Sequence, residues 1–594
     1  MSGFVASADH VATASVEPTL CSAINIAAHL PRMAAEAPHQ RAVIVTQARD
    51  KRSGKPVYQS WTFAELEALS NRYANGLTGA GFTRGERVIL MVRPGVDFVA
   101  LVFALFKIGA VPVMIDPGMG LGRLLECIRN VDAGGLIGVP AAHAVRVLRR
   151  SAFRKIKHVV TVGRRWFWGG RALDELARDA GETFRVAATA PGETAAILFT
   201  SGATGPAKGV VYEHAQFEAQ VRSIRDHYGI EPGEVDLPAF PLFALFSVAM
   251  GMTSVIPEMD PSRPARVDPA KIVNAIRDHR VTNTFGSPAI WSRVGRYCQE
   301  HGITLPSLRR ILIAGAPVQP EIIKRIRNVL GPEADVHTPY GATECLPISS
   351  ISGREILSGP SDRTRRGAGI CVGRALPGAD VRFIGISDDA IAEWSDDLEV
   401  GDGELGEIVV AGEVVTKAYF GRPDADRLAK IREVVPNGCA NGAGAPKAKA
   451  PPGEEPSVRI WHRIGDIGYR DADGRIWMCG RKGHRVETAG GTLFSVRCEA
   501  IFNQHDHVAR SALVGIGAIG AQRPIVVVEP IVGRFPSRKR AARFTAELLA
   551  LGRANDLTRD IRDILFHRSL PVDVRHNAKI NREALAVWAA KRLR

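Results

Sequence analysis

Short apolar runs rich in β-branched residues alternate with helical segments over most of this sequence. Strands that alternate with helices favour an α/β architecture with substantially parallel sheets. No internal repeat is visible. The expected elements are helices at 63–79 and 98–109 and strands at 87–92, 111–115, 136–139, 158–162, 195–200 and 311–314.

Composition places the chain among globular proteins. It has 594 residues, of which 45% are apolar and 23% charged, which excludes a disordered or collagen-like chain. The net charge of +15 admits an anionic partner. However, the densest basic runs are 149–157, 363–366 and 538–543, and apart from the single Phe153 no aromatic residue is interleaved with their basic residues. A solvated basic surface is therefore favoured over nucleic-acid binding.

Two features bear on the cellular compartment. The eight cysteines form no CxxC pair, so we expect a reduced, cytoplasmic protein without a disulfide framework or zinc site. Residues 1–20 lack a basic start followed by an apolar core, and no signal peptide is predicted. Residues 98–106 are too few to span a bilayer. Residues 237–256 carry no charge but contain prolines, and we expect a buried helix beside an apolar pocket rather than a membrane anchor.

Composition shifts also suggest a domain division. Residues 1–22 are expected to form a flexible tail. Residues 436–457 are rich in Pro, Gly and Ala and are predicted to be a disordered insert. A strand expected at 475–478 ends in a glycine-containing turn, so we expect a large domain at 23–482 and a small α+β domain at 483–594.

The strongest local motif lies at residues 197–210, where an apolar strand runs into a loop rich in Gly, Ser and Thr. Such a loop offers backbone N–H groups, hydroxyls and one cation to a polyphosphate. The spacing is not that of a Walker A loop, because a glycine follows the lysine. The residues concerned are Thr200, Ser201, Gly202, Thr204, Gly205 and Lys208.

This loop resembles the phosphate loop of the adenylate-forming superfamily, which includes acyl-CoA synthetases, peptide-synthetase adenylation domains and luciferases. Further segments, given at the end of this paragraph, also resemble motifs of the family and follow one another in the family's order. A series of matches in that order is not a chance result. The chain departs from the usual pattern at Ala203, at 206–207 and at Ala578. The further segments that resemble the family's motifs are 107–112, 116–117, 314–317, 338–344, 403–407, 419–423, 465–469, 480–482 and 576–582.

The resemblance implies a large multi-sheet adenylation domain and a small C-terminal domain on a hinge. It also implies that a carboxylate attacks the α-phosphate of ATP, with Mg²⁺ screening the negative charges. Glu344 is then the expected metal ligand, Thr343 contacts the α-phosphate, and Lys579 bridges the reacting groups. The loop residues named above hold the β- and γ-phosphates; the other implied nucleotide-binding residues are Gly315, Ala316, Pro317, Tyr340, Gly341 and Ala342 around adenine, and Asp466 and Arg481 at the ribose.

Two apolar segments, 240–246 and 285–288, fall where relatives build the acyl pocket. Neither contains a carboxylate or lysine that would pair with an amino-acid substrate. They therefore suggest a long alkyl chain. The residues expected to line the pocket are Phe240, Phe243, Phe285 and Gly286.

Over its whole length the chain resembles the olefin β-lactone synthetases. The resemblance rests on residues 114–120, 240–243, 251–252, 281–283, 285–288, 338–347, 480–482, 484–488 and 572–579. It implies that a long-chain 2-alkyl-3-hydroxy fatty acid is adenylated and then closed to a β-lactone by its own hydroxyl. It also suggests other olefin-pathway enzymes as partners, and neither nucleic-acid binding nor a membrane span.

Three alternatives remain open. The first is a long-chain acyl-CoA ligase, although Glu487 stands where thioester-forming relatives often carry lysine. The second is a family member with weakened catalytic activity that serves as a binding or scaffold subunit, in view of the departures from the family pattern at Ala203, 206–207 and Ala578. The third, and least favoured, is a nucleic-acid binder.

Overall fold

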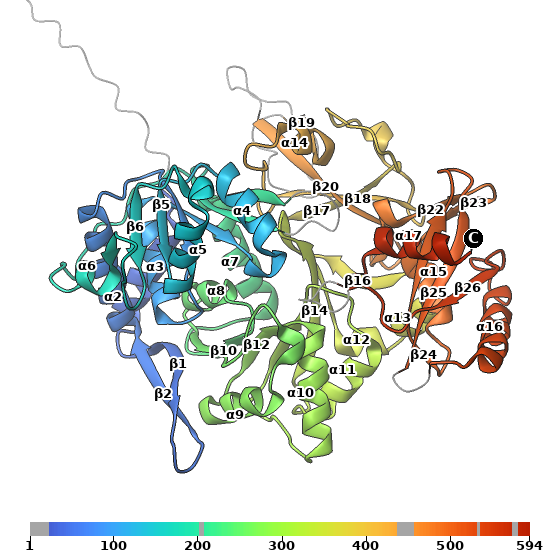
Figure 1. Cartoon of the computed structure of the whole chain (residues 1–594), viewed down its shortest axis with the longest axis horizontal. Coiled ribbons are helices and arrows are strands. Elements are labelled where there is room, and N and C mark those ends of the chain that lie inside the picture. Colours follow the sequence, from blue (N-terminus) through green and yellow to red (C-terminus); the bar gives the residue numbers. More distant parts are fainter. Residues whose placement is uncertain (1–22, 201–206, 436–456, 532–534, 573–579, 594) are drawn as a thin grey trace, which may run out of the picture.

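The computed structural model describes residues 23–200, 207–435, 457–531, 535–572 and 580–593. The expected tail, nearly all of the expected insert, and the site residues Ser201, Gly202, Thr204, Gly205 and Lys579 lie outside the described residues. The described chain is a mixed α/β structure with extended sheets, as the sequence predicts (Figure 1).

The first sheet gathers strands from the N-terminal third of the chain. Its order is β7-β6-β5-β3-β4-β8-β9, and all neighbours are parallel except β8 and β9. The strands expected at 111–115 and 195–200 correspond to β4 and β8 of this sheet, with bounds that agree to within one residue. The bounds are β3 (Arg87–Met91), β4 (Val111–Ile115), β5 (Gly135–Gly138), β6 (His158–Thr161), β7 (Arg171–Ala172), β8 (Thr194–Thr200) and β9 (Lys208–Glu213).

The second sheet runs in the order β17-β18-β20-β21-β16-β15-β14-β13-β12-β10-β11-β1-β2, and β19 pairs with β20. Strands β1, β11, β10, β12, β13 and β14 form a run of successive parallel pairs. Antiparallel pairs, β1 with β2 and β14 with β15, extend the sheet at both ends of this run. The bounds are β1 (Arg41–Arg49), β2 (Pro56–Thr62), β10 (Val235–Pro238), β11 (Thr253–Ile256), β12 (Asn283–Gly286), β13 (Arg310–Ile313), β14 (Asp335–Ala342), β15 (Cys345–Ser352), β16 (Ile370–Ala375), β17 (Ala379–Ile384), β18 (Gly406–Gly412), β19 (Lys430–Val435), β20 (Ser457–Arg470) and β21 (Ile476–Arg481).

Helices cover both sheets, and Figure 1 shows how they are distributed. Helix 63–79 has the predicted bounds, and a capping box between Thr62 and Glu65 fixes its start. The bounds are α1 (His29–Glu36), α2 (Phe63–Gly79), α3 (Val96–Ile108), α4 (Leu121–Asn130), α5 (Pro140–Leu148), α6 (Leu173–Ala177), α7 (His214–Tyr228), α8 (Phe243–Ala249), α9 (Pro269–His279), α10 (Pro288–Glu300), α11 (Pro320–Arg327), α12 (Gly353–Leu357), α13 (Pro360–Arg365), α14 (Pro423–Ala429), α15 (Ser495–Phe502), α16 (Arg538–Arg553) and α17 (Arg582–Arg592).

Helix α3 lies at the centre of the largest hydrophobic core. Its residues from Phe98 to Ile108 are all buried, which explains why the sequence is apolar on every face. Lys107, next to the end of this run, has a side chain that is 0% exposed. Its ammonium donates to Glu67, Ser70 and Asn71 at 2.6–2.7 Å, so the buried charge is paired and hydrogen-bonded.

The single buried helix expected at 237–256 is wrong. The segment contains β10, the short helix α8 and β11. Pro238 and Pro241 oppose a continuous helix because proline removes a backbone donor and clashes with the preceding turn. Gly251, with φ of +77°, reverses the chain before β11. Within the described residues, no helix is both long and apolar enough to cross a bilayer.

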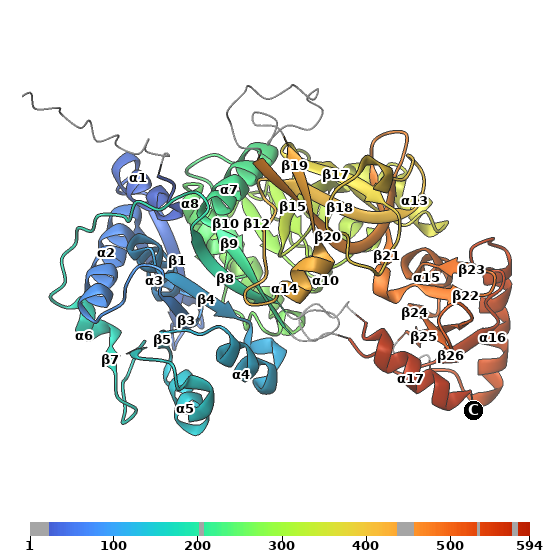
Figure 2. The same ribbon diagram turned by 90° about the horizontal axis from the view of Figure 1, so that it is seen from above.

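The C-terminal elements gather at the opposite end of the molecule from α2 and α6, as both ribbon views show (Figures 1 and 2). Hydrogen bonds hold them to α13 and the loop that follows it. Arg497 donates to the carbonyl of Gly367 and Gln504 to that of Arg365, both at 2.8 Å, and Asn555 donates to that of Arg366 at 3.4 Å. The domain division at residue 482 itself stays a prediction. The strands here are β22 (Val486–Thr488), β23 (Gly491–Leu493), β24 (Val508–Ile516), β25 (Arg523–Pro530) and β26 (Asp563–Phe566).

Candidate functional site

A cleft of about 2150 Å³ opens where the carboxyl ends of the parallel strands of both sheets meet. This edge is the usual ligand site of open α/β sheets, because the loops that leave the strands converge there. The cleft is bounded on its far side by residues of the C-terminal part, among them Ser495 and Arg582. Site residues predicted from sequence that line it are Lys208, Phe240, Phe243, Phe285, Gly286, Gly315, Ala316, Pro317, Tyr340, Gly341, Ala342, Thr343, Glu344, Asp466 and Arg481.

One polar cluster joins three of these residues from β14, β20 and β21. The Tyr340 phenol donates to Oδ2 of Asp466 at 2.7 Å, and Nε of Arg481 lies 3.0 Å from Oδ1. Asp466 is only 5% exposed, and its negative charge raises the pKa of the Arg481 guanidinium. Each carboxylate oxygen keeps a lone pair beyond these contacts. The cluster can therefore accept hydrogen bonds from vicinal hydroxyls of a bound sugar.

The turn between β14 and β15 carries Thr343 and Glu344 into the cleft. Tyr212 donates to the carbonyl of Thr343, and Thr416 donates through its backbone N–H at 2.8 Å to that of Glu344. The phenol of Tyr419 donates to Oε1 of Glu344 at 2.7 Å. Both backbone and side chain of this turn are thus held from neighbouring elements, which leaves Oε2 of Glu344 available to a cation.

Two lysines lie over the ring of Tyr419. Nζ of Lys208 is 4.7 Å and Nζ of Lys430 is 5.7 Å from the ring centroid. Lys430 is buried and donates to the carbonyl of Thr416. Desolvation lowers its pKa to about 8, although Glu344 opposes the shift. Sequence reasoning missed Lys430. The available signal was a single lysine between Leu428-Ala429 and Ile431.

The structure sets the two described ends of the phosphate loop opposite each other. β8 and β9 pair in an antiparallel register that places Thr200 across from Lys208. Beyond β13, the adenine segment turns through Gly315, whose φ of +89° suits glycine. The contacts of the loop residues 201–206 and of Lys579 lie outside the described residues, so their roles remain predictions.

The apolar wall of the cleft contains the expected aromatic residues. The rings of Phe243 and Phe285 stack with centroids 3.6 Å apart and planes 11° apart. Gly286 follows at the end of β12, where an added Cβ would lie 2.9 Å from Nε1 of Trp291. Phe240 is more exposed, at 46%, and lies at the rim of this wall.

A carboxyl group not anticipated from the sequence also borders this wall. Asp236 on β10 is 3% exposed and accepts from Ser247 at 2.5 Å and from Asn283 at 2.7 Å. Burial raises its pKa to about 6. The amide oxygen of Asn283 is buried and has no hydrogen-bond partner among the described residues. An acidic residue inside the apolar stretch 235–240 was the sequence signal.

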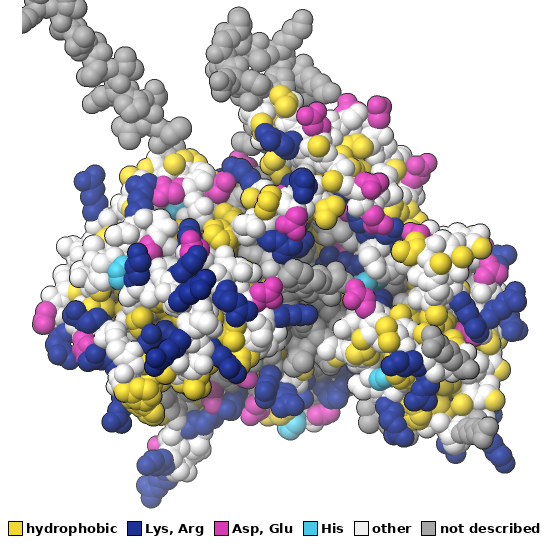
Figure 3. Space-filling view, turned by 45° about the horizontal axis from the view of Figure 1, so that its top comes forward, with side chains coloured by type: hydrophobic (Ala, Val, Ile, Leu, Met, Phe, Trp, Pro, Cys, Tyr) yellow, Lys and Arg dark blue, Asp and Glu magenta, His cyan; other side chains and the backbone are white. Residues whose placement is uncertain are grey.

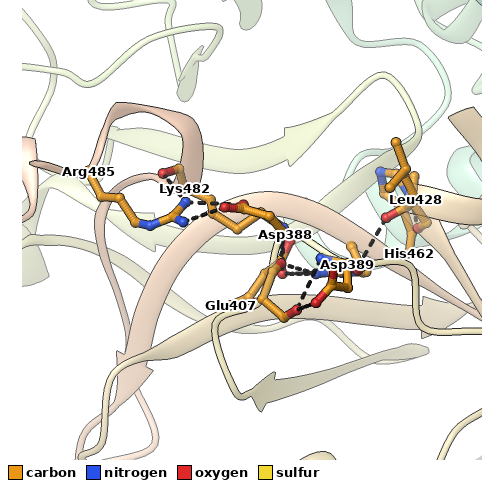
Figure 4. Close-up of polar contacts among 10 residues, drawn as sticks. Asp388, Asp389, Glu407, Leu428, His462, Lys482 and Arg485 are labelled. Atoms are coloured by element: carbon orange, nitrogen blue, oxygen red, sulfur yellow. Dashed lines mark hydrogen bonds and ion pairs between the residues drawn. The ribbon is translucent and has the colours of Figure 1, made fainter. Parts of the chain in front are cut away.

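An ionic network marks the junction with the C-terminal part (Figure 4). Glu407 of β18 accepts from buried Arg463 at 2.7 Å and from Lys482 at 3.0 Å. Arg485 lies 2.5 Å from Asp388 and donates to the carbonyl of Lys482 at 3.0 Å. The family resemblance implies a hinge around residues 480–483. On this segment Lys482 is held by buried Glu407, and just beyond it Arg485 is held by exposed Asp388.

Comparisons with known proteins agree with this geometry. The AMP-binding enzyme family matches residues 30–420. The chain belongs to the AMP-binding enzyme family. It is therefore an AMP-forming ligase with the α/β architecture of adenylate-forming enzymes. The family expectation drawn from the ordered motifs is confirmed.

Two relatives are similar over nearly the whole chain. An olefin beta-lactone synthetase of Xanthomonas campestris pv. campestris is 46% identical over 575 residues, covering 96% of this chain and 98% of the relative. One of Stenotrophomonas maltophilia is 45% identical over 573 residues, again covering 96% and 98%. Among solved structures, the O-succinylbenzoate coenzyme A synthetase MenE of Bacillus subtilis with ATP and magnesium ion has a TM-score of 0.69 at 21% identity, covering 93% of this chain and 98% of that one.

Proposed function

We propose that this enzyme adenylates a long-chain 2-alkyl-3-hydroxy fatty acid with ATP and then closes the acyl adenylate to a β-lactone, releasing AMP. The supporting observation is a single cleft that joins the polar cluster around Asp466 and Glu344 to the aromatic wall around Phe243. The products are proposed from the similarity to the olefin beta-lactone synthetases.

The polar end of the cleft suits an adenine nucleotide. Asp466 and Arg481 would hold the ribose, and Lys208 would face the phosphates from the end of β9. The residues also fit a divalent cation, because Oε2 of Glu344 has no hydrogen-bond partner among the described residues. Mg²⁺ held there would screen the phosphate charges against the attacking carboxylate.

The apolar end suits an alkyl chain. The stacked aromatic rings of Phe243 and Phe285 would exclude water from the alkyl chain, with the substrate carboxylate at the nucleotide end of the cleft. Orientation of the two reactants within one cleft lowers the entropic barrier to attack on the α-phosphate. Lys579, by resemblance, would neutralise negative charge as it develops there.

The second step distinguishes a lactone synthetase from an acyl-CoA ligase. In the lactone reaction the 3-hydroxyl attacks the acyl carbonyl, loses its proton and expels AMP, so no CoA is consumed. Glu487, which stands where thioester-forming relatives often carry lysine, accepts from Arg485 at 2.6 Å. This ion pair supports a second-step surface that differs from that of a thioester-forming enzyme.

The deciding experiment follows pyrophosphate release with ATP, Mg²⁺ and a 2-alkyl-3-hydroxy fatty acid in the absence of CoA, with products identified by NMR. We expect AMP and a β-lactone. The 2-alkyl acid without the hydroxyl is the matched substrate control, and should give adenylate but no lactone. Turnover that requires CoA and yields a thioester would establish the acyl-CoA ligase instead.

A further inference from the structure

A basic segment of the N-terminal sheet contains no acidic residue. Residues 133–173 include nine arginines and lysines and no aspartate or glutamate. The segment covers β5, α5, the short 3-10 helix Arg150–Phe153, β6 and the loop that leads to β7. On the part of the molecule that carries α5, Figure 3 shows Lys and Arg side chains gathered beside exposed hydrophobic side chains.

Large apolar side chains are exposed within this segment. Leu148 is 77%, Trp166 58% and Phe167 82% exposed. Isolated exposed apolar residues are ordinary on protein surfaces. Two neighbouring aromatic rings at the tip of one loop, flanked by arginines, are not explained in that way.

The tertiary structure fixes the aromatic loop against α5. Trp168 is buried, stacks on His143 with centroids 5.7 Å apart, and donates to Thr161 at 3.0 Å. Arg146 donates to the carbonyl of Trp168. The exposed rings of Trp166 and Phe167 lie 5.5 and 5.7 Å from the ring of Trp168. The loop tip and the end of α5 therefore form one surface, and both project on the same side in Figure 2.

Most of the arginines and lysines in the segment 133–173 have no acidic partner among the described residues. Lys155 pairs with Asp132 at 2.7 Å and Arg165 with Glu175 at 3.2 Å. Across the described part of the chain, no carboxylate lies within ion-pair distance of the others. The basic-aromatic surface consists of Leu148, Arg149, Arg150, Arg154, Lys157, Arg164, Trp166 and Phe167, all of them exposed.

We propose that the basic-aromatic surface binds the anionic surface of a lipid bilayer. Its cations complement anionic headgroups, and indole and phenyl rings at a loop tip suit the boundary between headgroups and acyl chains. A nucleic-acid site would present its aromatic rings along a basic groove, for stacking of successive bases. Here the rings stand at a projecting tip, which favours insertion into a soft interface.

Helix α5 connects this surface to the cleft. Ala141, Ala142 and Val145 line the cleft, and Leu148 lies at the exposed end of the same helix. A protein bound to a bilayer through this surface would hold one wall of its cleft close to a source of alkyl substrates. The binding itself does not depend on the proposed reaction, so the two fail independently.

The test measures binding of the full chain to phosphatidylcholine vesicles with and without phosphatidylglycerol, by flotation. We expect binding only to the anionic vesicles. The double variant Arg149→Gln/Arg150→Gln should weaken it about 25-fold, from about fivefold per charge. The double variant Trp166→Ser/Phe167→Ser should weaken it at least about tenfold. Quenching of tryptophan fluorescence by brominated lipid should decrease in the Trp166→Phe variant.

Matched controls come from the C-terminal part. Lys539→Gln/Arg540→Gln removes two exposed charges, and Ile519→Ser removes a side chain that is 79% exposed; both should bind as the unaltered protein does. Circular dichroism of each variant shows whether it is folded. Absence of binding to anionic vesicles would overturn the proposal. So would displacement by duplex DNA together with unchanged binding of the aromatic variant, since that result identifies a general polyanion site.

Discussion

The phenol oxygen of Tyr419 donates a 2.7 Å hydrogen bond to Oε1 of Glu344, 75 residues earlier in the chain. The ammonium groups of Lys208 and Lys430 lie 4.7 and 5.7 Å from the centroid of the same ring. Desolvation, followed by the nearby Glu344 charge, raises the pKa of the phenol well above its usual value. Tyr419 therefore remains a donor throughout the working pH range and orients the proposed metal ligand.

Tyr419→Phe tests this positioning role. A hydrogen bond to a charged group contributes about 1.5–3 kcal/mol, so we expect the Mg²⁺ concentration for half-maximal adenylation to rise about 10- to 100-fold. Metal-free nucleotide binding should change little. Tyr297→Phe on α10 is the control, because the Tyr297 phenol has no hydrogen-bond partner among the described residues. An unaltered metal dependence would assign Tyr419 to packing alone.

Asp466→Asn tests the proposed ribose site. The change weakens the acceptors that face Tyr340 and Arg481, and we expect the KM for ATP to rise about tenfold or more. 2′-Deoxy-ATP should show a smaller loss than ATP, because it lacks one of the hydroxyls concerned. Asp402→Asn, at an exposed turn, is the control. Equal losses with the two nucleotides would place Asp466 elsewhere in the mechanism.

Lys579→Ala tests the predicted C-terminal lysine. Removal of a cation that stabilises developing charge should lower the adenylation rate about 100- to 1000-fold, while the Kd for ATP stays the same. Pyrophosphate exchange measures the first quantity and calorimetry the second. Lys591→Ala on α17 is the control. Adenylation at the unaltered rate would show that another group provides the charge.

Asp236 predicts a dependence of stability on pH. Its pKa in the folded protein, about 6, exceeds the ordinary value of 3.8. Protonated Asp236 therefore contributes fully to the free energy of unfolding below pH 3.8, and this contribution is lost as the pH rises through 6. Arg310, the charged group that opposes this shift, is itself paired with Glu234 at 2.5 Å. At pH 7 Asp236→Asn should be more stable by up to about 3 kcal/mol.

Thermal unfolding at pH 5 and pH 7 measures this effect. The amide can accept from Ser247 and donate to the free oxygen of Asn283, so the variant keeps its hydrogen bonds. The stability gained by the variant should shrink as pH falls from 7 to 5. Asp226→Asn, on the exposed face of α7, is the control. A gain that does not vary with pH would mean that Asp236 is not the titrating group.

The Asp388–Arg485 pair predicts a salt-dependent junction. Asp388 is 67% exposed, and such pairs contribute about 0.2–1 kcal/mol. Asp388→Asn should therefore raise the rate of limited proteolysis near residues 480–490 by about fivefold at most, and high salt should abolish the difference. Asp389 lies in the same loop, and its carboxylate pairs with no arginine among the described residues, so Asp389→Asn should behave as the unaltered protein does. A salt-independent effect would point to loop folding instead.

The sequence predicted the local elements best where one strong local signal acted. Strand 111–115 and helix 63–79 have their predicted bounds, because an apolar run between glycines and a capping box are decided by neighbouring residues. It failed at 237–256, where uniform apolarity does not distinguish a buried helix from two buried strands around a short helix. The family was recognisable because ordered motifs survive in the linear sequence.

By itself, the sequence determined the α/β class, the order of the phosphate, adenine and ribose motifs, and the apolar character of the acyl segments. Only the tertiary structure decided that Tyr419 donates to Glu344 and that Lys430 lies near the Tyr419 ring. It also decided that Trp166 and Phe167 share a surface with the basic end of α5. These contacts join segments distant in the chain. Sheet order and helix packing set them, and no local propensity encodes either.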